Sequence, residues 1–532
     1  MASTSQLSVK THRPPEPDEE REGLLPLTVS DVEEVRPATD GLNEARRRFI
    51  ELMFKRLAII WGGLMVFTTG VYIWSMFMPL PGMTRSTMAP TTPYLFSGDT
   101  LRSNGTHEFK RTVVMVSIDG LRASYLDRGL TPHLLDISKK GLRARSMRPI
   151  FPTLTFPNHW ALMTGLYAES HGIVANEFWD PVTQETFHYN RVESAWKSKW
   201  WLGEPMWETA EKAGVITANL MWPGPPKTST NTSSTYFVPW RDHVPLGEKL
   251  DQILQWIDLP LESRPQLIVA YEPSLDQAGH STGPNSARVN ATLVQVDSFA
   301  KDLNAALEAR NLTNIVDIVF VSDHGMTDTS DPEVIYLDDI LGTEGVKAIH
   351  HVDGWPAMGL RFREDANITQ YLSLLLDASA ENPEKFKVYT TETMPKRFHF
   401  SKNERIAPIW VVPKIGYILT TREQGSAGMN KGSHGYDNKA EAMQAMFVAH
   451  GPFSHHARVI ARANPSSRGL TDWFKSAWNG GCHSKWQVAS KDTYIMNTFQ
   501  NVEIYNLIMK LLGIEHAAAP NNGTVGFWDQ YL

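Results

Sequence analysis

The chain has 532 residues, of which 42% are hydrophobic, and a formal net charge of -7 at pH 7. This length and composition predict one large α/β domain with appendages, or two or three small domains. No strongly basic stripe occurs in the body, so binding of nucleic acid on a charged face is not indicated, whereas binding of a small phosphate ester through metal ions is compatible with the sequence.

The first 45 residues are polar and rich in proline and glutamate, without sustained periodicity. This composition predicts a disordered tail in the cytosol. Within the tail, residues 20–25 read EREGLL and resemble an acidic dileucine signal for a sorting adaptor. An ordinary leucine pair in a polar tail is the simpler interpretation of the same residues.

Residues 57–77 form a run of 21 residues without a charged side chain. Such a run is long enough to cross a bilayer as a helix, and tryptophan and tyrosine near its ends suit the membrane interface. Lys55 and Arg56 precede the run directly, whereas the next basic residue after it is Arg85. The positive-inside rule therefore predicts a type II membrane protein with a lumenal or extracellular body. A buried core helix is the alternative.

Residues 80–110 are rich in proline, glycine, serine and threonine and are expected to form a stem between the membrane and the body. Cys482 is the only cysteine, so an intrachain disulfide is excluded, and either a vacuolar, lysosomal or other endomembrane lumen or the cell surface fits this usage. Six N-x-S/T sequons follow the apolar run and are candidate glycosylation sites. They are Asn104, Asn231, Asn290, Asn311, Asn367 and Asn522.

From residue 111 to residue 532, short apolar runs alternate with longer mixed segments. This pattern predicts βαβ units in a doubly wound, mostly parallel α/β domain. The final stretch at 502–514 has the apolar spacing of a helix that packs on the sheet. The expected strands are 113–118, 267–271, 315–321 and 443–448.

Five motifs place carboxylates, imidazoles and one hydroxyl where ligands of such a sheet gather, beyond the carboxyl ends of strands. Three crowded carboxylates require cations, and imidazole with carboxylate but no thiolate suits zinc. Two zinc ions would serve phosphoryl chemistry. Each residue also has a structural alternative, such as a helix cap or a solvated loop position. The residues are Asp119 in VSIDGLR, Thr155 in PTLTFPNH, Asp276 and His280 in EPSLDQAGH, Asp323 and His324 in VSDHGM, and His434 in GSHGYDN.

The spacing of Asp276 and His280 puts both side chains on one face if the segment is helical, although Gly279 makes a loop equally plausible. Thr155 is a weak nucleophile that metal coordination could activate, and a structural threonine between Pro152 and Pro157 is the alternative. The amide of Asn176 could stabilise the developing negative charge.

The blocks VSIDGLR, FPTLTFPNHWALMTGLYAESHGIVAN, VSDHGM and GSHGYDN resemble the nucleotide pyrophosphatase/phosphodiesterase family of the alkaline phosphatase superfamily, over roughly 111–532. The resemblance implies that Thr155 is the covalent nucleophile, that Asn176 binds the oxyanion, and that Phe156 lies against the substrate base with Trp222 on its other face. It assigns one zinc ion to Asp119, Thr155, Asp323 and His324. It assigns the other to Asp276, His280 and His434.

The chain resembles the short, single-domain members of this family, such as fungal ones, and its EPSLDQAGH segment departs from a more common EEPD-like form. The resemblance implies hydrolysis of phosphodiester or pyrophosphate bonds in nucleotides, with release of nucleoside 5'-monophosphates. A phosphodiesterase or transferase acting on lipid-head or glycolipid phosphates is the alternative enzyme. An inactive adhesion or receptor ectodomain is the alternative outside enzymes.

Overall fold

A computed structural model describes residues 53, 100–425, 430–454 and 495–532. The chain divides into two compact units, residues 1–89 and 90–532, and Met53 is the only described residue of the first. The predicted tail, its dileucine-like segment and the predicted membrane helix therefore lie outside the described residues. Within the described part of the chain, no helix has the length and apolar character needed to span a membrane.

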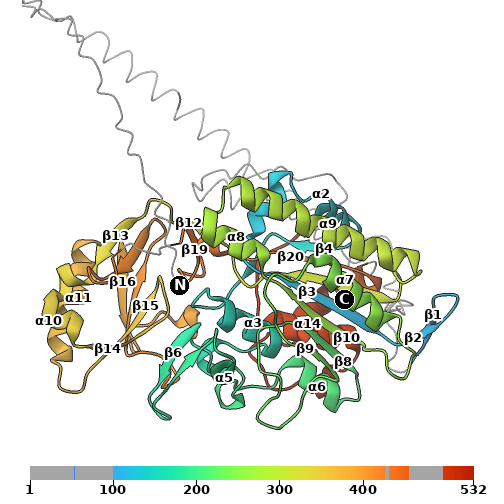
Figure 1. Cartoon of the computed structure of the whole chain (residues 1–532), viewed down its shortest axis with the longest axis horizontal. Coiled ribbons are helices and arrows are strands. Elements are labelled where there is room, and N and C mark those ends of the chain that lie inside the picture. The colour runs from blue at the N-terminus through green and yellow to red at the C-terminus, as the bar shows by residue number, and fades with distance from the viewer. Residues whose placement is uncertain (1–52, 54–99, 426–429, 455–494) are drawn as a thin grey trace, which may run out of the picture. The chain divides into compact units, whose positions relative to one another are not determined.

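The body of the second unit is built on an eight-stranded sheet (Figure 1). All neighbouring strands are parallel except β20, which runs antiparallel to both of its neighbours. The α/β class predicted from the sequence is confirmed. In sheet order the strands are β21 (Ile495–Met496), β4 (Leu142–Ala144), β20 (Phe447–His450), β11 (Val316–Val321), β3 (Thr112–Ile118), β10 (Leu267–Glu272), β8 (Thr217–Leu220) and β9 (Tyr236–Val238).

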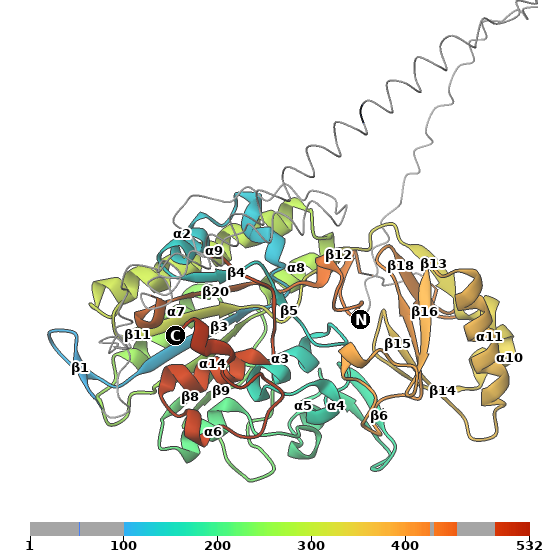
Figure 2. The ribbon, with the colours of Figure 1, turned by 180° about the vertical axis from the view of Figure 1, so that it is seen from behind.

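Both faces of the sheet are apolar, as the continuous apolar runs of its central strands require. Along β3, Val113 and Met115 belong to one buried cluster, and Val114 and Val116 belong to the other. The first cluster is completed by α3 (Thr155–Thr164), α6 (Met206–Lys212) and α14 (Glu503–Leu512). The second is completed by α2 (Pro132–Lys140), α7 (Leu246–Ile257), α8 (Ser274–Thr282) and α9 (Ala287–Ala309), as Figures 1 and 2 show from opposite sides.

A second, four-stranded antiparallel sheet forms one end of the body, to the right in Figure 2, and has its own apolar cluster. The sequence pattern gave no sign of it as a separate sheet. Its strands are β14 (Ile349–Asp353), β15 (Met358–Phe362), β17 (Ile409–Pro413) and β16 (Phe386–Thr390). They pack with α10 (Leu337–Lys347) and α11 (Ile368–Glu381).

Five two-stranded pairs and several short helices complete the described part of the body. The paired strands are β1 (Arg102–Ser103) with β2 (Glu108–Phe109), β5 (Met147–Arg148) with β22 (Phe499–Gln500), β6 (Glu177–Asp180) with β7 (Glu185–His188), β12 (Thr327–Asp328) with β19 (Gly432–Ser433), and β13 (Glu333–Tyr336) with β18 (Tyr417–Thr420). The short helices include α4 (Ala168–His171) and α5 (Val192–Ala195). The segment expected to be a stem is described only from residue 100, where β1 and β2 form an antiparallel pair.

The strands expected at 113–118, 267–271 and 315–321 and the helix expected near 502–514 are confirmed to within two residues at each end. The strand expected at 443–448 instead covers 447–450, because a 3-10 turn occupies 441–443. The parallel strands β3, β10 and β11 end at the same edge of the sheet, and this edge carries the site.

Candidate metal centre and active site

The carboxyl edge of the sheet places the predicted residues of the first group together. Asp119 directly follows β3, and Asp323 and His324 follow β11 after one residue. Thr155 is the first residue of α3, which begins beside them. These four residues are buried, and the side chains of Asp323 and His324 have no exposed area.

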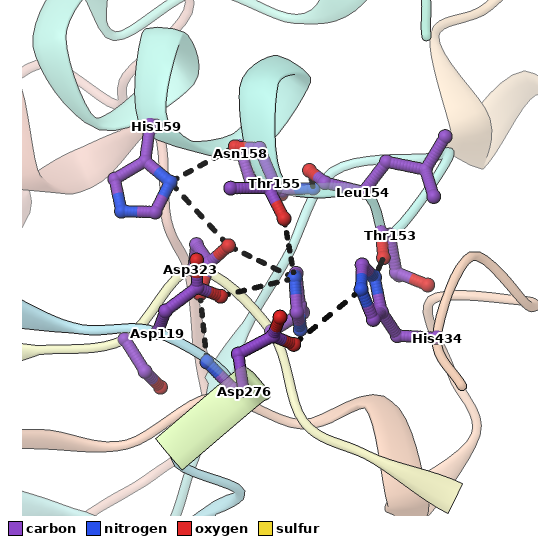
Figure 3. Close-up of polar contacts among 12 residues, drawn as sticks. Asp119, Thr153, Leu154, Thr155, Asn158, His159, Asp276, Asp323 and His434 are labelled. Atoms are coloured by element: carbon purple, nitrogen blue, oxygen red, sulfur yellow. Dashed lines mark hydrogen bonds and ion pairs between the residues drawn. The ribbon is translucent and has the colours of Figure 1, made fainter. Parts of the chain in front are cut away.

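The donor atoms of this group converge on His324 Nε2. That nitrogen lies 2.9 Å from Asp323 Oδ2, 3.2 Å from Thr155 Oγ1 and 3.4 Å from Asp119 Oδ1. Donors that share one tetrahedral zinc ion lie roughly 3.3 Å apart. Figure 3 shows the two carboxylates and the Thr155 hydroxyl facing the same point, so the predicted first group has the spacing of a single metal site.

A second group lies beside the first and comes from α8 and the β19 loop. Asp276 and His280 are one turn apart on α8, so the segment is the helix that the spacing allowed. His280 Nε2 lies 3.3 Å from Asp276 Oδ2, and His434 Nε2 lies 3.5 Å from Asp276 Oδ1 and 3.0 Å from His280 Nε2. The rings of His434 and His324 stack at 3.5 Å between centroids, so the two groups adjoin.

Backbone carbonyls select the same tautomer for the three histidines. Nδ1 of His280 lies 2.8 Å from Gly432 O, Nδ1 of His324 lies 2.9 Å from Gly325 O, and Nδ1 of His434 lies 2.9 Å from Thr153 O. Because a carbonyl only accepts, each Nδ1 donates its proton and each Nε2 is left with a lone pair. Three lone pairs that point into one site suit a cation, and this is the usual outer contact of metal-bound histidine.

The carboxylates also have the character of ligands. Asp119 Oδ1, Asp276 Oδ1 and Asp323 Oδ2 are buried and have no hydrogen-bond partner among the described residues. Burial, and then the neighbouring carboxylates of Asp323 and Asp276, raise the pKa of Asp119 well above its ordinary value. Two divalent cations would remove this repulsion and occupy the bare oxygens, so the residues present fit a two-metal centre.

His159 is a third buried imidazole next to the first group and could be mistaken for a ligand, since Asp119, His159 and Asp323 also bring donor atoms close together. Its ring nitrogens are both engaged. Nδ1 lies 2.9 Å from Thr155 O and 3.4 Å from Asp323 Oδ2, both acceptors, and Nε2 lies 2.9 Å from Ser117 Oγ. His159 therefore holds its proton on Nδ1 and supports Asp323 and the start of α3 rather than binding metal.

Two further contacts fix the carboxylates. The phenol of Tyr271 at the end of β10 donates a short hydrogen bond to Asp119 Oδ2. Burial and the nearby Asp119 raise the pKa of Tyr271 well above its ordinary value, so this phenol keeps its proton. Gly120 has a φ of +67°, and a Cβ there would lie 3.1 Å from Asp276 Oδ1. Glycine therefore allows the close approach of Asp276.

Asn176 lies beside the nucleophile candidate Thr155 at the start of α3. Its Oδ1 accepts a hydrogen bond of 2.9 Å from the backbone N–H of Phe156 at the start of α3. This contact uses the amide oxygen, so Nδ2 is the group of Asn176 that can donate to a ligand. Asn176, Thr155 and Phe156 all line the same cavity.

That cavity has a volume of about 700 Å³ and an aromatic wall. Tyr189, Trp196 and Trp240 are 43%, 41% and 53% exposed. The ring of Phe156 lies 5.2 Å from that of Tyr189. Trp222 also lines the cavity, but it is only 4% exposed and its ring meets His159 edge-on at 5.2 Å. The aromatic side chains that are open to the cavity are thus Tyr189, Trp196 and Trp240 rather than Trp222.

Residues 113–437 match the sequence model of one family, type I phosphodiesterase / nucleotide pyrophosphatase. The chain belongs to this family. It is therefore a member of a family of metal-dependent hydrolases in the alkaline phosphatase superfamily, and the predicted resemblance is confirmed.

Relatives of known sequence and structure agree with this membership. An uncharacterised pyrophosphatase/phosphodiesterase of Schizosaccharomyces pombe is 37% identical over 79% of this chain and 80% of its own length. Mouse ectonucleotide pyrophosphatase/phosphodiesterase family member 3 is 34% identical, and the chain spans only 44% of it. The structure is similar to murine family member 5, solved as an inactive threonine-to-alanine variant in complex with AMP, with a TM-score of 0.65, 28% identity and coverage of 79% of this chain and 100% of that one.

Several residues of the site were not identified from the sequence. His159 lies four residues after Thr155, so a helix beginning at Thr155 would have placed it above the centre. Tyr271 ends a predicted strand next to the Asp276 motif, which was the available signal. Trp240 and Tyr189 stand in segments without a motif, and their place in the cavity depends on tertiary structure.

The six sequons all fall within the described residues. Four asparagines are exposed, and two are half-buried, of which Asn104 donates from Nδ2 to Arg310 O at 2.8 Å. The half-buried asparagines are Asn104 and Asn290, and the exposed ones are Asn231, Asn311, Asn367 and Asn522.

Proposed function

We propose that this protein is a two-zinc hydrolase that cleaves phosphodiester and pyrophosphate bonds of nucleotides through a threonine-linked nucleotidyl intermediate. The observation that carries the proposal is the meeting of two donor groups beside the Thr155 hydroxyl. Oxygens of Asp119, Asp323 and Thr155 all lie within 3.4 Å of His324 Nε2, and the second group adjoins them across the stacked rings of His324 and His434.

Zinc is the metal that these donors favour, because the described site offers imidazole nitrogen and carboxylate oxygen. Asp119, Asp323, His324 and Thr155 would hold one ion. Asp276, His280 and His434 would hold the other. When bound, the two ions would lower the pKa of the threonine hydroxyl and neutralise charge on the phosphoryl group and leaving oxygen.

The side chains of the protein supply the nucleophile and its orientation. Thr155 Oγ1 releases its proton to solvent and attacks phosphorus, the new O–P bond forms, and the bond to the leaving oxygen breaks with its electron pair remaining on that oxygen. Asn176 Nδ2 donates to a non-bridging phosphoryl oxygen, where negative charge grows. The helix N-terminus at Thr155 adds a favourable dipole for an anionic group at this position.

A water molecule then displaces Thr155 from phosphorus. Its oxygen forms the new O–P bond, the bond to Thr155 Oγ1 breaks, and the products are a nucleoside 5'-monophosphate and the free threonine hydroxyl. No other covalent group is needed, so the nucleophile, the oxyanion donor and the donor sets account for the whole reaction.

Nucleotides are the substrate class that the cavity supports best. Phe156 and Tyr189 provide aromatic surfaces within reach of Thr155, and aromatic faces stack on nucleobases of any sequence. AMP bound to the inactive variant of murine family member 5, a relative whose structure matches 79% of this chain, supports the same ligand class here.

A substrate panel with the zinc-loaded full-length chain tests this proposal. Dinucleoside polyphosphates, nucleotide sugars and nucleoside triphosphates should yield nucleoside 5'-monophosphates, and a lysophospholipid should be cleaved at least about a hundredfold more slowly. Efficient release of phosphocholine with no action on nucleotides would favour the lipid-head alternative. No hydrolysis of any substrate by folded, zinc-loaded protein would favour an inactive ectodomain.

We also propose that the body is held on the lumenal or extracellular side of a membrane by residues 57–77. The basic residues before this run and the sequons after it motivate the proposal. Endoglycosidase should shift the mass of the full chain, and replacing the exposed Asn367 by Gln should remove one increment. Unmodified protein that protease digests completely in sealed vesicles would contradict this orientation.

A further inference from the structure

The cavity beside Thr155 is poor in positive charge. Among its lining residues in the described part of the chain there is no lysine and no arginine. The charged residues that line it are Asp119 and Asp276, with the imidazoles of His280 and His434 beside them. Two divalent ions would neutralise the aspartates and a phosphoryl group, but no lining side chain is left to pair with further anionic groups of a substrate.

The leaving-group side of the cavity is neutral at its surface. Beyond Asp276 and His280, the wall is made by Gln277 and Ser281 of α8 and by Asn430. Ser281 Oγ donates to the backbone oxygen of Gln277 at 2.9 Å. These amides and hydroxyls form hydrogen bonds with neutral, hydroxylated groups but do not compensate a second or third phosphate charge.

The charge next to this wall is negative. Gln277 Nε2 donates to Asp242 Oδ1 at 3.2 Å. The only cation partner of Asp242 among the described residues is the exposed ring of His243, 3.4 Å away, which is charged only when protonated. Arg241 pairs instead with Glu248. An anionic leaving group would therefore approach a carboxylate rather than a basic side chain.

Lys431 is the lysine nearest in sequence to this wall. It follows Asn430, and a Cβ built on Gly283 at the end of α8 would lie 3.8 Å from the Cβ of Lys431. Lys431 is not part of the cavity lining. Its exchange for glutamine therefore serves as a control for charge in the neighbourhood of the cavity.

We propose that this site selects nucleotide substrates by the charge at the distal end of the leaving group. It favours nucleotide sugars and nucleotide diesters, whose leaving group ends in an uncharged sugar or alkyl group, over nucleoside di- and triphosphates, whose leaving group ends in a charged phosphate. The inference rests on the proposed function, since it concerns the same cleavage. Binding comes from aromatic stacking and from hydrogen bonds to the uncharged, distal part of the leaving group. Each additional phosphate charge approaches Asp242 and, among the described residues, no cation of the cavity lining, so it weakens binding and transition-state stabilisation.

A series with one scissile bond and rising distal charge tests the inference. ADP-glucose, the β-methyl ester of ADP, ADP and ATP all release AMP by cleavage of the same anhydride. We expect kcat/KM to be at least about tenfold lower for ATP than for the methyl ester. This ratio of the two kcat/KM values should approach one as added salt screens the charges. The methyl ester separates the effect of charge from contacts with glucose.

Two test variants and two control variants locate the effect. Ser281→Lys adds an ammonium to the wall and should raise kcat/KM for ATP relative to the methyl ester at least about fivefold, whereas the matched neutral variant Ser281→Gln should leave the ratio unchanged. Asp242→Asn should raise the ratio of kcat/KM for ATP to that for the methyl ester about two- to threefold. Lys431→Gln should have no effect. Zinc content and thermal midpoint confirm that each variant is folded and loaded.

The outcomes separate this inference from the proposed function. Cleavage of ATP as efficient as that of the methyl ester by the wild type would overturn the charge selection and leave the hydrolase proposal intact. A ratio that Ser281→Lys changes no more than Ser281→Gln would also overturn it. If the zinc-loaded wild type cleaves none of the four substrates, the proposed function itself fails.

Discussion

The two donor groups of the centre differ in how they are held. The first is built at the ends of core strands, and its side chains are almost completely inaccessible: 2% or less for Asp119, Asp323 and His324. The second is built on α8 and a loop, and the side chains of Asp276 and His280 are 13% and 24% exposed. The first is therefore the more closed group. The second, through Asp276 and His280, is the more open group, although the side chain of its His434 is only 5% exposed.

This difference in exposure fits separate roles for the two groups in the proposed reaction. A nucleophile needs a fixed position relative to phosphorus, because small displacements are costly in rate, and Thr155 belongs to the closed group. A leaving group and an incoming water need access, and the open group adjoins the cavity and its neutral wall. If this comparison is right, changes in the two groups should have different consequences.

Replacing Thr155 by Ala should have the largest effect. We expect kcat to fall by at least about a thousandfold, because the covalent route is lost, while both metal ions are retained by the six remaining ligands. Thr155→Ser keeps the hydroxyl and should retain measurable activity. Turnover of the Ala variant within tenfold of the wild type, with normal metal content, would exclude the threonine-linked intermediate.

Removing one ligand from each group should sharpen the comparison. Asp119→Asn should lower kcat/KM more than a hundredfold, because it disturbs the site that holds the nucleophile, and His280→Gln should lower it about ten- to a hundredfold. Each variant should lose about one equivalent of metal. Equal losses of activity that excess zinc fully restores in both variants would show that the two groups are not functionally distinct.

Chelation should remove the two ions in order. The more exposed group should release its ion at least about tenfold faster, so zinc content and activity should both decay in two phases, with the first equivalent lost from Asp276, His280 and His434. The decay can be followed by elemental analysis of samples taken over time. A single phase that removes both equivalents would contradict the difference in access.

Tyr271→Phe should weaken the closed group alone. It deletes the hydrogen bond to Asp119 Oδ2 without changing the shape of the ring, so the zinc affinity of this group should fall about tenfold. Activity should recover at saturating zinc, and the affinity of the open group should be unchanged. If both affinities fall equally, Tyr271 has a general structural role.

Asp317 lies at the other end of β11 and is a buried carboxyl away from the metal centre. Its replacement should have a smaller effect, which is on stability. Burial raises its pKa to about 7. Since the folded pKa exceeds the unfolded one, this group contributes stability below pH 4 that is lost as the pH rises to about 7. Asp317→Asn should therefore stabilise the protein by ~1–3 kcal/mol more at pH 8 than at pH 5 in chemical unfolding. If the variant and the wild type differ in unfolding free energy by the same amount at both pH values, the pKa of Asp317 is not raised.

Much of the centre could be predicted because its residues stand directly beside regular elements. Asp119 and Asp323 follow apolar strands, and the four-residue spacing of Asp276 and His280 fits the helix that is present. Local sequence carries this information, since strand ends and helix faces are defined by periodicity.

The remaining features depend on contacts between distant segments. The antiparallel direction of β20 is not encoded in its apolar run, because parallel and antiparallel buried strands read alike. Trp222 lines the cavity but packs edge-on against His159, so its place against the substrate base stays a prediction, while the open ring of Trp240 had no motif. The neutral wall near Asp242 likewise arises only when the loop after β9 meets α8.

The most direct test of the account is anomalous scattering at the zinc edge from crystals of the purified protein. The account predicts two peaks a few ångströms apart, one among Asp119, Asp323, His324 and Thr155 Oγ1, and one among Asp276, His280 and His434. A single peak, a peak on His159, or folded protein without bound transition metal would contradict it.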